Sequence, residues 1–540
     1  MEGTLHGVRR NAGRLAVAGA MTLTVLSVAA PQALAITTRY VDRNASTCAD
    51  TGSGAGSASK PYCTISRAAK LALPGDTVVV EPGIYRETVS PKYSGTDVAP
   101  ITYLADGPGV VIQGTTDLSE PDGAWTLFSG DAWQRSLSVT PNQVFVDDEA
   151  LSKVPTTAVD STPDTWGYDA ANLLLFVNLG GPNPAVGHDV EAGSLKYGIS
   201  LSSDSHIVFD GFEVRYQNTY GARITGGTDL TLSHLNVSWT ASYGIGVSGG
   251  TTNATIADSE VSHAKSKGVR LSAVSSSSVL RNDVHDNGDH GIALSNADDN
   301  VIDANTSHDN AVPGKRIAVG IDLFSSDNTI VRNNTLYHNQ DSGMNTRSGS
   351  LNTLVVRNVS YGNGDHGFDT VGAALGTRYV SDTSYGNYKD GFSIEGSSTG
   401  TTVYDCIAMA NGLTTNEFDL WVSTDAASGF FSDSNIFWHA GAGYPIRYSG
   451  TSYKTLTKFS NATPFEDHGK DGDPLFVDAA NGDLQLSFGS PAIDAGDASV
   501  SGFQAEDHDG IAPVDDPVTI DTGSGTPTYA DIGALEYIPA

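Results

Sequence analysis

Carboxylate and amide side chains recur at one position of a short phrase, Gly-apolar-variable-apolar, which repeats along the middle of the chain. Asp322, Asn345 and Asp369 occupy the variable position in three successive copies. If the copies stack as neighbouring strands, these residues form an exposed polar stripe, with the carboxylates of Asp322 and Asp369 roughly 10 Å apart. Oxygen donors in such a stripe suit calcium binding or acid–base chemistry.

Further charged side chains flank the same phrases and complete a candidate site. We expect calcium to be held by Asp341, Asn345, Asp365 and Asp369. We expect catalysis to involve Lys389, His366, Asp322 and Arg347. Lys389 is the first candidate for a base and His366 the second. A lengthened coil places a loop, residues 311–318, at the same level, and long loops on repeat proteins border the binding face.

Three functions fit this cluster. In calcium-assisted β-elimination, the ion would bridge a uronate carboxylate while a base removes the C5 proton. In inverting glycoside hydrolysis, Asp322 and Asp369 would act as acid and base, near the upper end of the spacing that this mechanism uses. In the third, the protein binds glycans or lies on the cell surface without catalysis, and its Asp and Asn residues serve as turn formers.

The repeated phrase predicts the architecture that positions these residues. Its copies are separated by steps of 23 to 29 residues and begin at Gly221, Gly244, Gly268, Gly291, Gly320, Gly343, Gly367, Gly391 and Glu417. Such a period with strand-like repeats indicates stacked units that bury their apolar residues only against their neighbours. We therefore predict an all-β fold, a right-handed parallel β-helix with coils of about 23–24 residues.

A second column of residues keeps the same register. Its members are Asn287, Asn310, Asn339, Asn363, Asn387 and Asn411. Stacked Asn side chains can satisfy one another and the backbone of tight turns, so this column is expected to be structural. Tyr337, Tyr361 and Tyr385 lie two residues before three of these asparagines and are expected to stack.

Changes in composition divide the chain into five segments. Residues 1–35 have a basic start, an apolar core and an Ala-Leu-Ala end, and predict a secretory signal. Residues 36–115 predict an N-terminal cap with a short helix and the first coils, and 116–193 a small β-rich insertion. Residues 194–440 hold the coils, and 441–540 the last coils and a C-terminal wrap.

The net charge and the cysteine content limit which binding partners and which cellular compartment are expected. The formal net charge of −32 argues against nucleic acid, which needs a basic footprint. No later stretch approaches the apolar length of a membrane span. We therefore expect a secreted, extracellular, soluble monomer with a polysaccharide partner. Export permits a disulfide between Cys48 and Cys63, whereas Cys406 is expected to be buried alone.

The N-terminal pattern, the coils and the DPLFVD, GSPAIDAGD and DIGALEY phrases near the end resemble secreted bacterial β-helix proteins of the polysaccharide-lyase type, in particular family 9 pectate lyases. In that family a DDGFD phrase holds most of a calcium site. The matching phrase here, residues 365–369, has His366 in place of one Asp. The resemblance implies a calcium-assisted lyase acting on a uronate-containing glycan such as pectate.

Two departures qualify this resemblance. The family's catalytic lysine, in a GFKLGG phrase, falls on Ser393 here, or on Asp369 if the register shifts by one coil. The coils are also similar to mannuronan C5-epimerase modules, whose GFD phrase continues Asp-Pro-His. Here Asp322 is followed by Leu323 and Phe324.

Overall fold

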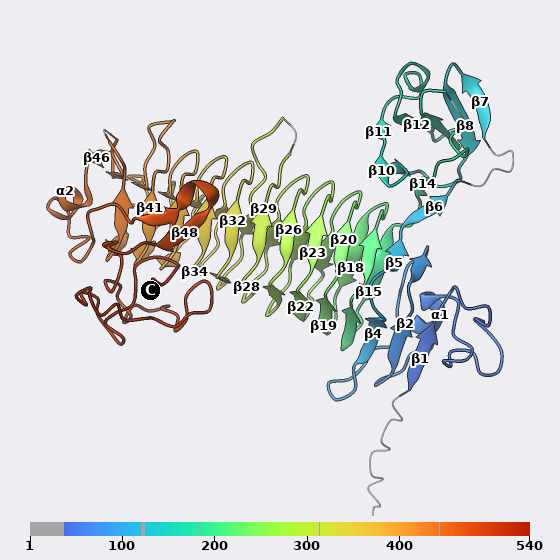
Figure 1. The fold of residues 1–540 in the computed structure, drawn as a ribbon, viewed down its shortest axis with the longest axis horizontal. Coiled ribbons are helices and arrows are strands. Elements are labelled where there is room, and N and C mark those ends of the chain that lie inside the picture. Colours follow the sequence, from blue (N-terminus) through green and yellow to red (C-terminus); the bar gives the residue numbers. More distant parts are fainter. Residues whose placement is uncertain (1–36, 120–124, 182, 313, 442, 540) are drawn as a thin grey trace, which may run out of the picture. The chain divides into compact units, whose positions relative to one another are not determined.

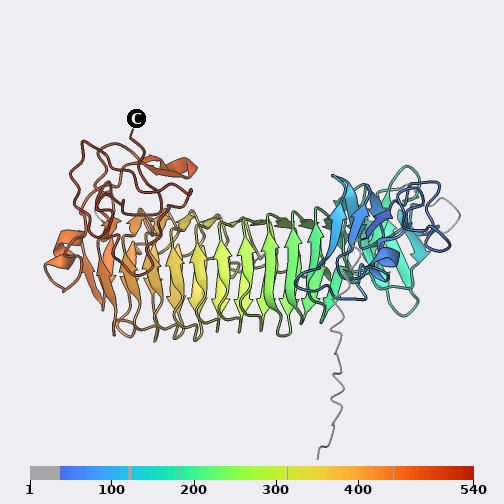
Figure 2. The ribbon, with the colours of Figure 1, turned by 90° about the horizontal axis from the view of Figure 1, so that it is seen from below.

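The computed structural model describes residues 37–119, 125–181, 183–312, 314–441 and 443–539, which belong to one compact unit. The predicted signal, residues 1–35, lies outside them. The fold is a right-handed parallel β-helix, as the repeat predicts (Figures 1 and 2). None of the helices among the described residues is long and apolar enough to cross a membrane.

Three long sheets run along the coils. Sheet 1 comprises β1 (Thr38–Val41), β2 (Thr77–Val80), β4 (Ile101–Ala105), β16 (Ile207–Asp210), β19 (Thr228–Ser233), β22 (Thr252–Ala257), β25 (Ser278–Leu280), β28 (Val301–Asp303), β31 (Ile330–Arg332), β34 (Leu354–Val356), β37 (Arg378–Val380), β40 (Thr402–Tyr404) and β43 (Phe431–Asp433). Sheet 2 comprises β15 (Tyr197–Ser202), β18 (Tyr220–Thr225), β21 (Ile245–Ser248), β24 (Val269–Ser272), β27 (Ile292–Ser295), β30 (Ile321–Phe324), β33 (Met344–Arg347), β36 (Phe368–Val371), β39 (Phe392–Ile394), β42 (Leu420–Val422), β45 (Ile446–Tyr448) and β46 (Thr451–Tyr453). Sheet 3 comprises β3 (Gly83–Tyr85), β5 (Val110–Gln113), β17 (Glu213–Arg215), β20 (Asn236–Ser238), β23 (Glu260–Ser262), β26 (Asp283–His285), β29 (Thr306–His308), β32 (Thr335–Tyr337), β35 (Val359–Tyr361), β38 (Thr383–Tyr385), β41 (Ile407–Met409) and β44 (Ile436–Trp438).

The repeated phrases form sheet 2, and their apolar positions point into the core. Ile321 and Leu323 are fully buried on either side of Asp322, and every coil contributes equivalent residues to one continuous apolar cluster. Each strand is only three to six residues long in the coils, so its burial depends on the coils above and below it.

The register of sheet 2 corrects one expectation. Asp322 aligns with Asn345, Asn345 with Asp369, and Asp369 with Ser393, as the phrases predict. The variable position of the copy at Glu417 is Asp419, which would continue the stripe if the spacing were kept. Ser393 instead aligns with Trp421, so this copy is offset by two residues and Asp419 does not continue the stripe. The stripe is also less exposed than expected, since Asp322 and Asp369 are only 3% and 7% exposed.

The asparagine column forms a buried ladder. Each Asn side chain donates to the Oδ1 of the next coil at 2.9 to 3.1 Å, and Asp419 accepts from the last member, Asn411. A second ladder, which the sequence reading missed, joins Asn282, Asn305, Asn334 and Asn358 and ends on Asp382. Both ladders satisfy polar groups at buried turns, which would otherwise be destabilising.

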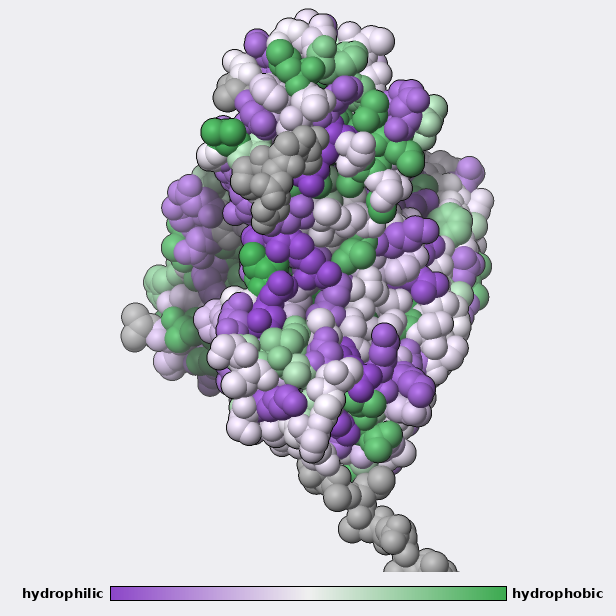
Figure 3. Space-filling model, turned by 90° about the vertical axis from the view of Figure 1, so that its right-hand side faces the viewer, coloured by the Kyte–Doolittle hydropathy of each residue, from purple (hydrophilic) through white to green (hydrophobic). Residues whose placement is uncertain are grey.

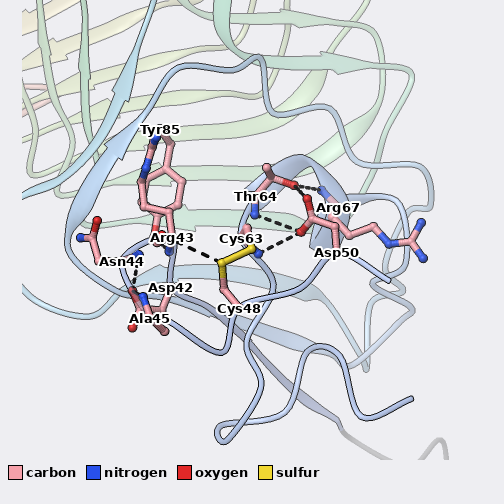
Figure 4. The surroundings of a disulfide bond; sticks show 10 residues. All are labelled: Asp42, Arg43, Asn44, Ala45, Cys48, Asp50, Cys63, Thr64, Arg67 and Tyr85. Carbon is pink, nitrogen blue, oxygen red and sulfur yellow. Dashed lines mark hydrogen bonds between the residues drawn. A yellow bond between two sulfur atoms is a disulfide. The ribbon is translucent and has the colours of Figure 1, made fainter. Parts of the chain in front are cut away.

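The N-terminal cap contains the expected helix, α1 (Ile65–Ala69), which buries Ile65, Ala68 and Ala69 against the first coils. Thr64 caps it by accepting from the backbone N–H of Arg67. A disulfide joins Cys48 and Cys63 just before the helix, and Asp50 accepts from the backbone of Cys63 beside it (Figure 4). Cys406 is buried and unpaired.

The insertion has its own sheets and core. One sheet comprises β6 (Thr115–Asp117), β9 (Val144–Val146), β10 (Glu149–Ala150) and β14 (Val190–Gly193). The other comprises β7 (Thr126–Ser129), β8 (Ala132–Ser136), β11 (Ser152–Lys153), β12 (Thr165–Asp169) and β13 (Leu174–Asn178), with a short 3₁₀ turn at Val159–Ser161. Phe145 stacks on Tyr216 of the coils at 3.9 Å. Hydrophilic and hydrophobic residues are intermixed on the face of the molecule that carries the cap and insertion (Figure 3).

The C-terminal wrap contains few regular elements. These are α2 (Leu456–Ser460), β47 (Phe476–Asp478), a 3₁₀ turn at Ala479–Asn481 and β48 (Asp483–Leu486). Its apolar residues Leu486, Ile493 and Ile532 pack against Ile407 and Ile436 of sheet 3. The wrap therefore covers the outer face of the last coils (Figure 2).

Candidate functional site

Asp322 is engaged by an arginine from the next coil. Arg347 donates through Nε to Oδ1 at 2.6 Å and through Nη2 to Oδ2 at 2.8 Å. The hydrogen bonds to Asp322 raise the pKa of Arg347 further, and Nε2 of His290 lies 3.5 Å from the same carboxylate. Both oxygens of Asp322 are thus committed, an arrangement that holds a charge in place rather than freeing it for proton transfer.

Asp365 is likewise paired, with two cations. Nζ of Lys389 lies 2.9 Å from its Oδ1, and Nη2 of Arg316, from the lengthened coil, lies 2.6 Å from the same oxygen. Burial opposes the charge on Lys389, but the hydrogen bond to Asp365 outweighs burial and raises the pKa of the lysine. A lysine with a raised pKa keeps its proton at neutral pH and is poorly suited to act as a base.

His366 lies among carboxylates. Its Nδ1 lies 3.2 Å from the backbone nitrogen of Asp390 and 3.2 Å from that residue's Oδ2. Burial disfavours the imidazolium, but Asp390, Asp369 and Asp365 outweigh burial and raise the pKa of His366 to about 9. Both candidate bases therefore favour their protonated forms at neutral pH, and their catalytic role stays a prediction.

The four expected calcium ligands fit an ion only in part. Asn345 and Asp369 each have a buried Oδ1 with no hydrogen-bond partner, which suits a metal ligand. Burial raises the pKa of Asp369 to about 7. Asp341 accepts from the backbone of Ser342, and Asp365 is bound by two cations. Among the described residues, these acidic groups do not bring three oxygens within 4.8 Å of one another.

A pocket of about 490 Å³ opens beside this cluster, along β36 to β45. It is lined by His366, Lys389, Asp390, Glu395, Glu417, Phe418, Trp421, Ser423, Thr424, Arg447 and Gly450. Burial raises the pKa of both Glu395 and Glu417, with the carboxylate of Asp390 as a further cause. Trp421 is half-buried in its wall. The pocket thus offers two carboxyl groups with raised pKa values, an aromatic side chain and cations to one ligand.

The sequence reading placed part of this pocket. His366 and Lys389 are predicted site residues, and Glu417 is predicted only as the start of a repeated phrase. Glu395 and Trp421 are not among the predicted site residues. The usable signals were the 26-residue step and the missing glycine at Glu417. Both indicate that the register changes there, which brings Trp421 into line with Ser393.

A larger hollow, of about 910 Å³, lies over sheet 3 and includes the tyrosine column. The rings of Tyr337 and Tyr361 stack at 5.1 Å and 9°, and His308 stacks on Tyr337 at 4.6 Å. The ring of Tyr337 is therefore covered on both faces by His308 and Tyr361, which makes it part of a structural stack. The expected stack ends at Tyr361, because the ring of Tyr385 meets Phe476 edge-on at 6.1 Å instead.

Comparison with known proteins supports the fold. A family described as "Right handed beta helix region" matches residues 197–319. A 60-residue stretch is 42% identical to "Uncharacterized protein YwoF" of Bacillus subtilis (strain 168), covering 11% of this chain and only 13% of that protein.

Two solved structures are similar at low identity. The structure titled "The complex structure of XylC with xylose" is 15% identical, with a TM-score of 0.60, over 82% of this chain and 87% of that one. "Crystal structure of pectate lyase Pel9A" is 15% identical, with a TM-score of 0.44, over 93% and 96%. The first of these similarities shows a shared fold and leaves the reaction open.

Proposed function

We propose that this protein is a carbohydrate-active enzyme that hydrolyses a glycan in the pocket lined by Glu395 and Glu417. The observation that carries the proposal is that both carboxyl groups line one pocket and have raised pKa values. A carboxyl group with a raised pKa can act as the acid that protonates a leaving glycosidic oxygen, while a second, ionised carboxylate activates water. The resemblance in fold to carbohydrate-active proteins supports the substrate class.

The remaining pocket residues support an acidic sugar as ligand. Trp421 offers an apolar face to a sugar ring. Arg447 is exposed, and no ion pair joins it to a carboxylate among the residues that the structure describes. Its guanidinium can therefore pair with the carboxylate of a uronate.

Calcium-assisted β-elimination is the second candidate, because the unpartnered oxygens of Asn345 and Asp369 suit a hard cation. Their set of donors is incomplete, because Asp365 is bound by Lys389 and Arg316. Lys389 would have to lose a proton that Asp365 helps it retain.

We also propose that the protein is exported and acts outside the cell, on the basis of residues 1–35.

Product analysis separates these reactions. The purified chain would be incubated with polygalacturonate, alginate, glycosaminoglycans and xylo-oligosaccharides, with calcium or with chelator, while reducing ends and absorbance at 235 nm are recorded. Hydrolysis predicts new reducing ends without absorbance, abolished in Glu395→Gln and Glu417→Gln but kept in Glu260→Gln, an exposed glutamate outside the pocket. Calcium-dependent absorbance that is lost in Lys389→Met would instead establish β-elimination. Saturable binding without either product would mark a non-catalytic glycan binder.

A further inference from the structure

The last part of the described chain consists of loops, which are held in place by contacts other than regular secondary structure. Within the described residues 487–539 there is no helix or strand. Asp494 is a hub for these loops: its backbone carbonyl accepts from Thr522 and Gly523, and its Oδ1 accepts from the backbone of Asp516. Its own N–H donates to Asp531 at 2.7 Å. Asp494 therefore ties the segment around residues 516–523 to the chain at Asp531, and the adjacent Ile493 packs against Ile407 and Ile436 of the coils.

Three carboxylates converge at this hub. One oxygen each from Asp494, Asp515 and Asp521 lies within 4.8 Å of the others. Oxygens bound to one calcium ion at about 2.4 Å are at most about 4.8 Å apart, so the group matches the span of a calcium site. Asp515 and Asp521 are exposed, which leaves room for water to complete the coordination.

Asp494 supplies an independent indication of a ligand. The residue is fully buried, yet its Oδ2 has no hydrogen-bond partner. Leaving a buried carboxylate oxygen unpaired is costly unless something binds it. Burial, together with the carboxylates of Asp515 and Asp521, raises the pKa of Asp494 to about 6.

A second cluster of three acidic residues, in the insertion, has its negative charge balanced by an arginine. Asp117, Asp189 and Glu191 also converge, but Arg86 forms ion pairs with Asp117 and Glu191. By contrast, among the described residues no basic side chain forms an ion pair with Asp494, Asp515 or Asp521. The C-terminal cluster is therefore not compensated by a basic side chain of the described residues, whereas the cluster in the insertion is compensated by Arg86.

We propose that Asp494, Asp515 and Asp521 form a structural calcium site that fastens the C-terminal loops to the β-helix. The site is separate from Asp341, Asn345, Asp365 and Asp369, and the proposal does not depend on the enzymatic one. Calcium would join the buried turn at Asp494 to the two exposed residues of the following loop. It would replace the regular hydrogen bonding that this part of the described chain does not have.

Calcium binding to the chelator-stripped full chain tests the proposal. Titration calorimetry with calcium chloride should show saturable binding, and calcium should raise the melting temperature relative to EDTA. The double variant Asp515→Asn/Asp521→Asn should bind calcium at least tenfold more weakly and lose the calcium-dependent shift. These two side chains are exposed, so the variant should fold. A matched control, Asp467→Asn/Glu506→Gln, removes two other exposed acids of the wrap and should behave like the wild type.

Two results would overturn the site. One is a wild-type chain that shows neither calcium binding nor a calcium-dependent melting shift. The other is calcium binding that persists unchanged in Asp515→Asn/Asp521→Asn. If Asp365→Asn/Asp369→Asn then abolishes binding, the calcium ion belongs to the coils. Because the readouts are binding and stability, the result is independent of whether the protein cleaves any glycan.

Discussion

Arg347 donates two hydrogen bonds to Asp322 of the preceding coil and forms an ion pair with it. The sequence had suggested an exposed carboxylate at this position. Asp322 is almost fully buried. The pair therefore links two neighbouring coils, and neither residue lines the pocket of Glu395 and Glu417.

Arg347→Ala should destabilise the protein by about 3 kcal/mol, because it leaves a buried carboxylate without its partner. Urea unfolding measures the loss. The double variant Arg347→Ala/Asp322→Asn should recover part of it, since the unpaired charge is then removed. Equal destabilisation of the single and double variants would show that the effect comes from lost packing.

The pH dependence of activity should follow the two pocket glutamates. Their raised pKa values place the working range above that of ordinary carboxyl groups. Activity should fall at low pH as the base is protonated, and at higher pH as the acid loses its proton. A profile centred at or below pH 4.5 would contradict this assignment.

Lys389→Met should shift that profile toward higher pH. The ammonium of Lys389 lowers the pKa of both glutamates, and its removal also leaves Asp365 less well compensated. Kinetics across pH 4 to 9 would measure the shift, with Lys92→Met, far away in the N-terminal cap, as control. Complete loss of turnover at every pH would instead support Lys389 as a base.

Asp382→Asn should stabilise the protein at pH 8 and have little effect near pH 4. Burial raises the pKa of Asp382 to about 7, above its value in the unfolded chain. Stability linked to this group is therefore fully present at low pH and is lost as pH rises through about 7. An Asn there would extend the ladder of Asn282, Asn305, Asn334 and Asn358. Thermal unfolding of both proteins at the two pH values checks the difference, and an equal effect at both would refute the linkage.

Loss of the disulfide should destabilise the N-terminal cap. Cys48 and Cys63 close a loop of 15 residues, which constrains the unfolded chain by about 3 kcal/mol. Cys48→Ser/Cys63→Ser should unfold at lower denaturant concentration than the wild type, and a reducing agent should affect only the wild type. A reductant effect on the double variant would point to another cause.

The sequence by itself determined the coil architecture. The spacing of the phrases at Gly221 to Gly391 and of the asparagine column predicted sheet 2 and its neighbours, because a stacked fold repeats the same local environment at a fixed chain interval. The Cys48–Cys63 disulfide, the helix α1 and the β-rich insertion could also be predicted, since each depends on local patterns. The same periodicity placed Asp322, Asn345 and Asp369 in one row.

Only the tertiary structure decided what those residues can do. Whether a carboxylate is free, as at Glu395, or bound, as at Asp322, depends on side chains one coil away whose direction the spacing does not specify. The offset that brings Trp421 into the pocket depends on how a turn is accommodated in the stack. The meeting of Asp494 with Asp515 and Asp521 depends on loops without a period. Periodicity fixes the position of a residue along the stack, whereas charge pairing and burial, which set reactivity, arise from contacts between coils and loops.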